Sequence, residues 1–282
     1  MPEREYHAHP SLSSTQARQL LESPSHYKWA LDHPRPDTQA FDVGTAAHTK
    51  ILGVGAGIIA YPAEHLTPSG NVSTKPATAS WADEQRANGL TPVTPDSVAA
   101  VDAMAESVLA HPAARRLLEQ PGHPEASIFA TDPDTGIDVR CRFDYLSDPG
   151  IGPWTAVDVK TAGDRGASAH EFTKSVAKWG YDVQQGHYQD TARFDLGVEP
   201  SFYYVVVEKT APYRVAVHQL TDPWEQMGKA KARIARERLA EARATGDWWG
   251  YPEEVTYLDA PTWLEYDYED RYGDPIGTEL KL

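Results

Sequence analysis

Two aspartates and a lysine have the clearest potential for chemistry in this chain of 282 residues. Asp144 is followed 14 positions later by the triplet Asp158-Val159-Lys160. Paired carboxylates are oxygen ligands that suit a hard divalent cation, usually Mg²⁺ or Mn²⁺. An ammonium group two residues from such a ligand can orient water and stabilise charge on a phosphate. The pattern therefore predicts metal-dependent phosphodiester hydrolysis, although solvated strand charges with a Lys–Asp ion pair would produce the same short motif.

Two predicted strands must bring these residues together. Residues 137–146 alternate between apolar and polar side chains, and residues 155–161 follow after a short Pro/Gly turn. Because residues two apart in a strand point the same way, Asp158 and Lys160 share one face while the flanking valines face the core. Asp144 ends the polar face of the first strand, so a short hairpin can place it beside Asp158.

Other polar residues surround this pattern. His48 lies on a predicted helix over 41–52, whose small residues let another element approach closely, and Glu125 opens a predicted strand. On the predicted helix at 181–196, the side chains at i, i+3 and i+7 share one face; these are Tyr181, Gln184 and Tyr188. Each feature also has an ordinary interpretation, because a lone histidine is more often structural and a Tyr/Gln face more often serves packing.

The remaining elements predict a mixed α/β (α+β) fold, in which a central mixed β-sheet is flanked by helices. Two strands follow the 181–196 helix, and a basic helix covers about 222–244. Residues 53–95 are rich in Gly, Pro, Ser and Thr, which predicts a mobile or variable insertion around one helical piece. No clean linker divides the chain, so we expect one domain over 1–282, made of a helical part at about 11–120, a core at about 121–245 and an acidic aromatic tail at about 246–282.

Composition excludes several classes of protein. The single Cys141 rules out an intrachain disulfide and a multi-cysteine zinc or iron–sulfur site. No stretch approaches the roughly 18 apolar residues of a membrane span, and the N-terminus has no signal-peptide core, so a soluble cytoplasmic protein is expected. The net charge of −15 argues against broad adhesion to nucleic acid or anionic membranes. Residues 247–282 carry ten acidic and two basic side chains, so much of this charge is local.

Two features keep alternative interpretations. The helical stretch at 228–243 has six basic side chains, which could contact DNA phosphates or simply be solvated. The tail is crowded with Trp and Tyr, which could pack on the body, mediate subunit contact or dock a partner protein. Arg140 and Arg142 lie on the Asp144 face of their strand and could contact phosphate, or could pair with Asp138 or Glu125.

The ordered motifs resemble the PD-(D/E)xK nuclease superfamily, in its RecB-like branch, and most closely the phage RecE/exonuclease VIII type. The matching stretches run from residue 11 to about 192 and are SLSSTQARQLLESPSHYKWAL, DVGTAAHTKIL, PEASIFATDPDTGIDVRCRFDYL, AVDVKTAGD and WGYDVQQGHYQDTA. The resemblance implies a restriction-endonuclease-like core. Iron–sulfur members of the branch have a Cys before the N-terminal Pro and three later cysteines. This chain has Ser23-Pro24 and no later Cys, so a cluster is excluded.

The resemblance also implies roles for individual residues. Lys160 would serve the attacking water, and Gln184 and Tyr188 would form a Q-x-x-x-Y motif on the DNA-facing side. The implied metal ligands are His48, Asp144, Asp158, the Val159 carbonyl and, as a frequent acidic position of the family, Glu125. Thr161 follows the lysine as in many relatives, and it joins Tyr181, Arg140 and Arg142 as a candidate for DNA contact.

The activity implied is that of a Mg²⁺-dependent exodeoxyribonuclease, with Mn²⁺ as a substitute, acting on the ends of linear double-stranded DNA. Relatives degrade one strand 5′→3′ and leave a 3′ single-stranded tail. They form trimeric or tetrameric rings and work with a single-strand annealing protein, which predicts a phage- or prophage-encoded protein of a bacterial cytoplasm. An endonuclease or repair nuclease on the same fold, or an inactive DNA-end-binding scaffold, are the alternatives. The intact set of Asp144, Asp158 and Lys160 argues against the scaffold.

Overall fold

The computed structural model describes residues 1, 3–33, 42–147, 150 and 152–273, and the chain divides into two units after Trp249. The expected start of a helix at Phe41 lies outside the described residues. Unit 1 covers Met1–Trp249 and contains every residue discussed above as a site candidate. Among the described residues, no helix has both the length and the apolar character needed to cross a membrane.

A five-stranded mixed sheet forms the centre of unit 1, in the order β3-β4-β5-β6-β7. The strands are β3 (Gly122–Thr131), β4 (Asp138–Ser147), β5 (Thr155–Ala162), β6 (Ser201–Glu208) and β7 (Val215–His218). The β3–β4, β4–β5 and β6–β7 pairs are antiparallel, whereas β5 and β6 are parallel. A parallel pair needs a crossover connection, and here that connection contains two helices. The predicted mixed sheet flanked by helices is confirmed.

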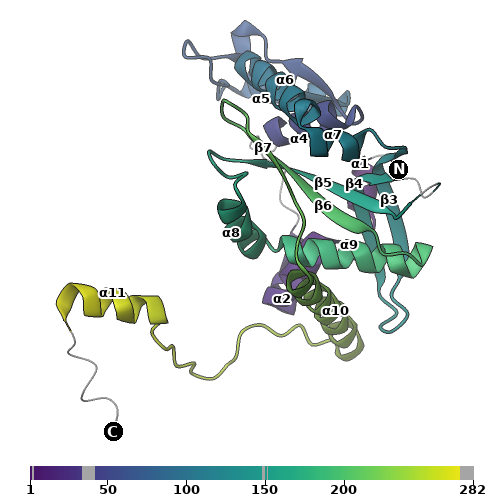
Figure 1. Cartoon of the computed structure of the whole chain (residues 1–282), viewed down its shortest axis with the longest axis vertical. Helices are drawn as coiled ribbons and strands as arrows, with labels where there is room; N and C mark the ends of the chain where they lie inside the picture. The colour runs from purple at the N-terminus through teal and green to yellow at the C-terminus, as the bar shows by residue number, and fades with distance from the viewer. Residues whose placement is uncertain (2, 34–41, 148–149, 151, 274–282) are drawn as a thin grey trace. The chain divides into compact units, whose positions relative to one another are not determined.

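Helices cover both faces of this sheet (Figure 1). One layer contains α4 (Asp42–Leu52), α6 (Pro95–Ala110) and α7 (Pro112–Leu118), and the other contains α8 (Ala169–Trp179) and α9 (Tyr181–Leu196). Alternation along β5 divides its side chains between the layers: Val157 and Val159 pack with α4 and α6, and Ala156 packs in the α8–α9 layer. Asp158 and Lys160 have the parity of Ala156, so β5 presents them toward α9.

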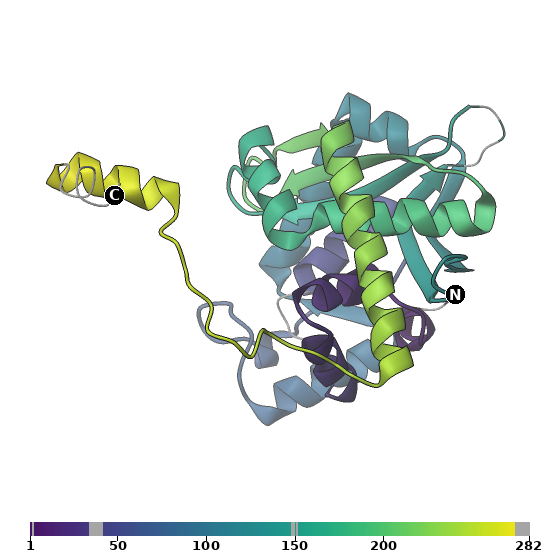
Figure 2. The same ribbon diagram turned by 90° about the horizontal axis from the view of Figure 1, so that it is seen from below.

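A backbone-to-backbone contact fixes α9 against α10 (Asp222–Thr245), which crosses it on the side away from the sheet (Figure 2). A Cβ added to Gly228 would lie 2.1 Å from the Asp182 carbonyl oxygen, and one added to Gly186 would lie 2.5 Å from the Gly228 carbonyl carbon. Only glycine permits so close an approach. The two helices therefore behave as one rigid support behind the sheet.

The N-terminal segment completes the sheet edge and the helical layer. Leu12 forms a parallel bridge to Val139 on the edge of β4 that β5 leaves free. Ser13 then caps α2 (Ser14–Glu22) in a capping box with Gln16. The other N-terminal elements are α1 (Glu3–Ala8) and α3 (Pro24–Asp32).

The stretch at 53–95 has more regular structure than its composition predicts. It forms a two-stranded parallel sheet, and its elements are β1 (Gly57–Ala60), η2 (Ala63–His65), α5 (Pro76–Ala87) and β2 (Leu90–Val93). Val93 packs into the same core cluster as α4 and α6, so tertiary burial stabilises strands that Pro and Gly disfavour locally.

Unit 2 begins at Gly250 and, in its described part, contains one helix, α11 (Thr262–Tyr272), which the sequence analysis did not predict. None of the α11 residues is buried. Its apolar side chains are distributed around the helix without an amphipathic stripe, so periodicity gave no helical signal.

Candidate active site

The site begins where β4 and β5 separate. Their ladder consists of only Tyr145 opposite Val157 and Leu146 opposite Ala156. Just beyond it, the Val159 N–H donates to Asp144 Oδ2 at 2.6 Å. A side-chain carboxylate thus replaces the missing strand partner, which keeps this buried backbone donor satisfied. The predicted closeness of Asp144 to the Asp158-Val159-Lys160 strand is therefore present in the structure.

Asp158, Lys160 and Gln184 form a closed polar cluster between β5 and α9. Lys160 Nζ lies 2.6 Å from Asp158 Oδ2 and donates to Gln184 Oε1 at 3.2 Å. The Gln184 amide nitrogen donates in turn to Asp158 Oδ1 at 2.6 Å. The ammonium also lies 4.8 Å from the centre of the Tyr181 ring, within cation–π range. These contacts fix the lysine head group rather than leaving it solvated.

A second group has the composition of a metal site. The metal-capable group consists of His48, Glu125 and Asp144. Each of these residues offers one ligand atom, and these atoms lie within 4.8 Å of one another. The Val159 carbonyl oxygen is 2.6 Å from His48 Nε2, so it borders the same space. Two carboxylates, a carbonyl and one imidazole fit Mg²⁺ and fit Mn²⁺ better, because Mn²⁺ accepts nitrogen more readily. Asp158, which was predicted as a metal ligand, is not a member of this group, and its carboxylate contacts Lys160 and Gln184.

Glu125 has the most unusual backbone of the site. The β3–β4 ladder pairs Pro124 with Tyr145 and Ala126 with Phe143, but Glu125 and Asp144 between them do not pair. Glu125 has φ 52°, in the left-handed region that non-glycine residues rarely occupy. Such conformations cost about 1–3 kcal/mol and concentrate at functional sites. Here the local twist accompanies the placement of Glu125 beside Asp144 and His48.

Burial and charge shift the pKa values of Asp144 and Lys160. Burial raises the pKa of Asp144 to about 6, and Asp158 adds to this rise, while His48, Lys160 and the Val159 N–H oppose it. Burial alone would lower the pKa of Lys160, but the charges of Asp158 and Asp144 hold it above its usual value. Lys160 is therefore a permanent cation at neutral pH, positioned beside a group of anions that a bound cation would stabilise.

A cleft of about 680 Å³ gives access to this region. Its walls include the metal-capable group's His48 and Glu125, together with Lys160 and the candidate DNA contacts Thr161, Tyr181 and Arg142. Lys209, one residue past β6, also lines the cleft and was missed by the sequence analysis. Because β6 runs parallel to β5, the residue after β6 must lie at the same sheet end as Lys160, and this topology was the only available signal.

Two predicted site residues lie elsewhere. Tyr188 packs edge-on against Phe143, with ring centroids 5.2 Å apart, and lines a second cleft of about 350 Å³ beside α2. Arg140 lines that second cleft as well and is 4% exposed. Its guanidinium donates to main-chain carbonyls of the N-terminal segment, those of His7, His9 and Ser11. The structure therefore gives Arg140 a structural role and brings neither residue into the cleft of Lys160.

Arg142 does reach the main cleft, but its donors are engaged. Nε donates to Ser127 Oγ at 2.9 Å, Nη2 donates to the Met1 carbonyl at 2.9 Å, and Nη1 lies 3.7 Å from Glu125 Oε2. Of the two roles that the sequence left open, pairing with Glu125 is the one that the structure shows.

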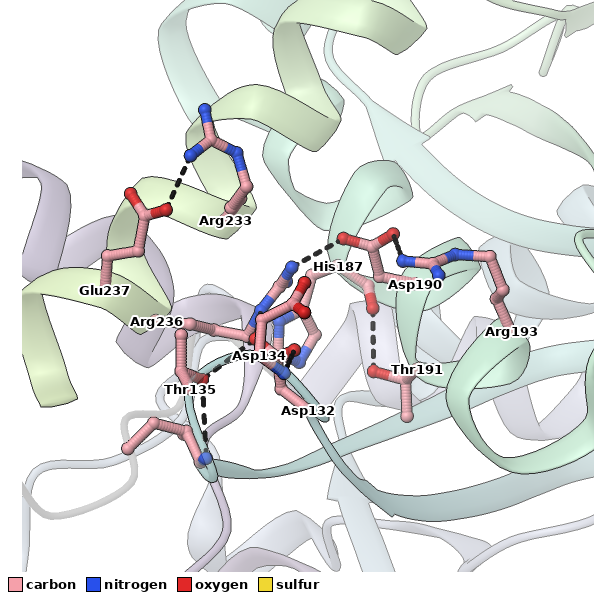
Figure 3. Close-up of polar contacts among 11 residues, drawn as sticks. Asp132, Asp134, Thr135, His187, Asp190, Thr191, Arg193, Arg233, Arg236 and Glu237 are labelled. Carbon is pink, nitrogen blue, oxygen red and sulfur yellow. Dashed lines mark hydrogen bonds and ion pairs between the residues drawn. The ribbon is translucent and has the colours of Figure 1, made fainter.

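The basic side chains of α10 also serve internal contacts (Figure 3). Arg236, 3% exposed, donates to Asp132 at 2.6 Å and to Asp190 at 2.8 Å. Lys231 lies 2.6 Å from Asp182, and Arg238 donates to backbone carbonyls at the end of α2. These ion pairs join α10 to α9 and to the β3–β4 turn, which favours the structural interpretation of the basic stretch.

The match of this chain to a known protein family agrees with the arrangement of these residues. A family model described as "PDDEXK-like domain of unknown function" (DUF3799) matches residues 13–261. The chain belongs to this PDDEXK-like family. The match covers all of the site residues, and the five-stranded mixed sheet with helices on both faces is the fold expected for a PDDEXK-like domain.

Solved structures support the fold. A crystal structure from Eubacterium rectale, described as a "Putative exonuclease", is 13% identical, with a TM-score of 0.59 over 97% of this chain and 99% of that chain. A structure described as SSO0001 is 11% identical over 80% of this chain and 84% of that chain, but its TM-score of 0.31 is too low to support an argument. No curated protein sequence matches the chain.

Proposed function

We propose that this PDDEXK-like protein is a Mg²⁺-dependent exodeoxyribonuclease of the RecE/exonuclease VIII type. It would digest one strand of linear double-stranded DNA, 5′→3′, and leave 3′ single-stranded tails for recombination by strand annealing. The observation that carries the proposal is the adjacency of two groups beside one cleft, whose walls include Lys160, His48 and Glu125. The Asp158–Lys160–Gln184 cluster supplies a fixed cation, and the His48–Glu125–Asp144 group supplies a site for a hard divalent ion.

The metal-binding residues and Lys160 would have different roles in hydrolysis. A divalent ion bound by His48, Glu125 and Asp144 would supply Lewis-acid activation of the scissile phosphate and of water. Lys160 is held by Asp158 and Gln184, so its ammonium can orient the attacking water and offset the negative charge that develops on the phosphate. The Tyr181 ring covers one side of the ammonium and limits its movement.

The test is digestion of linear duplex DNA labelled at either the 5′ or the 3′ end, in Mg²⁺, in Mn²⁺ and in EDTA. Release of the 5′ label as short products in metal, with none in EDTA, is expected. Lys160→Ala and Asp144→Asn should each lower the rate by about 100-fold or more, because preorganised charge contributes about 10²–10³ in rate. His170→Gln, at an exposed position outside the cleft, is the matched control.

Covalently closed circular DNA separates the exonuclease from its alternatives. An enzyme that requires an end should leave the circle intact, whereas cutting of the circle would make the protein an endonuclease on the same fold. Wild-type digestion by Lys160→Ala would refute the assigned role of the lysine. Absence of cleavage in any metal, with DNA ends still bound, would identify an inactive end-binding scaffold.

The resemblance to RecE-type enzymes extends the proposal to assembly and partners. We propose a trimeric or tetrameric ring, a single-strand annealing protein that loads on the new tail, and a phage or prophage origin with action in the bacterial cytoplasm. Light scattering across micromolar concentrations measures the assembly directly, and a monomer throughout would exclude the ring.

A further inference from the structure

Lys209 differs from the other cations of the main cleft. Lys160 is paired with Asp158, and Arg142 is engaged by Glu125, Ser127 and Met1. Lys209 is exposed, and no hydrogen bond or ion pair to its ammonium is present among the described residues. Within the described lining of the cleft, it is therefore the one lysine or arginine without an internal acceptor.

Its position relative to Lys160 is fixed by the sheet. The Lys209 N–H donates to the Ala162 carbonyl at 2.9 Å, two residues beyond Lys160 on β5. Val206 is the register partner of Lys160, and Lys209 follows it by three residues. At about 3.3 Å per residue, this places the Lys209 backbone about 10 Å farther along the sheet. Successive phosphates of one DNA strand advance about 3.4 Å along the duplex axis, so this distance corresponds to about three nucleotide steps.

A hydroxyl group lies at the same end of the cleft. Thr161 pairs with Val207, and Lys209 follows two residues later, so Thr161 and Lys209 share one side of the sheet. Gly44 on α4 faces Thr161, and a Cβ added there would lie 3.7 Å from Thr161 Oγ1. Gly44 has no side chain to cover the hydroxyl, and Thr161 and Lys209 both line the cleft. A hydroxyl donor with a free ammonium is a suitable pair for a phosphodiester.

We infer that Lys209 and Thr161 form a second phosphate site, which binds a non-scissile phosphodiester about three nucleotides from the cut. This inference rests on the proposed function, because it assumes that the scissile phosphate lies beside Lys160. Lys209 is a binding residue here, which positions the strand through a non-scissile linkage and takes no part in the chemistry. The metal-capable end of the cleft and the Lys209 end then define the path of the DNA strand.

The test measures DNA binding and cleavage separately in the full-length protein. Binding of fluorescein-labelled linear DNA is followed by anisotropy in Ca²⁺ between about 50 and 200 mM salt. Lys209→Gln should weaken binding about 3- to 10-fold at low salt and reduce the slope of log K against log salt by about 0.7–0.9, the value for one lost phosphate contact. In cleavage assays, KM should rise while kcat changes less than twofold.

Three comparisons make the result specific. Lys209→Arg should retain the wild-type slope, and Lys75→Gln, at an exposed lysine outside the cleft, should retain both affinity and slope. DNA with a neutral methylphosphonate at a single linkage should lose affinity for the wild type when the linkage is about three steps from the cut. Lys209→Gln should be insensitive to the same replacement.

The outcomes separate this inference from the proposed function. Unchanged affinity and slope in Lys209→Gln, with normal cleavage by the wild type, would overturn the second phosphate site and leave the nuclease intact. Absence of cleavage by the wild type would refute the nuclease, whereas a Lys209-dependent slope in Ca²⁺ would still support the phosphate site. A fall in kcat with unchanged KM would also overturn the inference, since it would place Lys209 in the chemistry.

Discussion

Glu125 combines a candidate metal-ligand carboxylate with a left-handed backbone conformation in the middle of a strand. A glycine would adopt this conformation without strain, so the glutamate is retained at a cost to stability. Its ion pair with Arg142, at 3.7 Å, is too long to offset much of that cost. The position is explained more readily by binding than by folding.

In a strand, an alanine variant is usually more stable than a glycine variant, and substitution at Glu125 should reverse this order of stability. Glu125→Gly should be more stable than Glu125→Ala by about 1 kcal/mol, because only the alanine retains the strained φ. At Ser127 on the same strand, the alanine variant should instead be the more stable one. Urea unfolding of the four variants measures both differences. Equal stability of the two Glu125 variants would show that the backbone is not strained there.

His187 makes stability depend on pH. It is fully buried on α9, its ring bonds the Arg140 carbonyl at 3.0 Å, and burial lowers its pKa to about 4. The unfolded chain, with a usual histidine pKa near 6.5, takes up the proton first as pH falls. The free energy of unfolding therefore includes the full contribution of neutral His187 above about pH 6.5. As the pH falls from 6.5 to about 4, the free energy of unfolding decreases by up to roughly 3 kcal/mol.

His187→Gln should flatten this part of the stability profile. Chemical unfolding at several pH values between 4 and 7 measures the slope, and His170→Gln, at an exposed position, should keep the wild-type slope. An unchanged slope in His187→Gln would assign the acid sensitivity to other groups.

At the scale of elements, α9 supplies Gln184 and Tyr181 to the site, and its position depends on α10. The contact of Gly186 and Gly228 leaves no space for a side chain, and the buried Arg236 joins the two helices through Asp190 (Figure 3). Neither contact touches the site, yet together they determine where Gln184 lies.

Gly228→Ala should therefore destabilise the protein by about 2 kcal/mol or more, although alanine normally stabilises a helix interior by about 1 kcal/mol relative to glycine. The added Cβ would meet backbone atoms of Asp182, which cannot move without shifting α9. Thermal unfolding and cleavage rate should both fall. Gly163→Ala, where an added Cβ has nothing within 4 Å, is the control expected to change little.

The elements of the core were predictable because period-2 alternation and helix punctuation are local signals. The predicted strand at 137–146 and the predicted helix at 181–196 are confirmed within about a residue. The regular structure within 53–95 and the α11 helix were not predictable, since burial against distant elements, or the absence of an amphipathic pattern, leaves no local signal. At the site, adjacency of Asp144 to β5 followed from the sequence, but the φ of Glu125 and the approach of Lys209 depend on the folded sheet.

At the scale of the whole molecule, the metal-capable group draws on three elements that meet only in the folded state. His48 comes from α4, Glu125 from β3 and Asp144 from β4. A cation that binds these residues together binds only the native state, so it stabilises folding by mass action, about 2.7 kcal/mol at a hundredfold excess over Kd.

Mn²⁺ should accordingly raise the melting temperature relative to EDTA, and Asp144→Asn should remove the rise. Asp164→Asn, at an exposed carboxylate outside the group, should keep it. Differential scanning calorimetry of the three proteins measures the effect, and a rise that persists in Asp144→Asn would place the ion elsewhere.

The single parallel pair in the sheet also restricts how this kind of protein can diverge. The connection from β5 to β6 must cross over the sheet, and α9 with Gln184 is part of that crossover. Asp144, the Asp158-Val159-Lys160 triplet and Gln184 therefore occur in this order in the sequence because β4, β5 and the crossover helix α9 follow one another along the chain. Side chains of the core can change while this order is kept, whereas a circular permutation that cuts between β5 and α9 would place the lysine near one end of the new chain and the glutamine near the other.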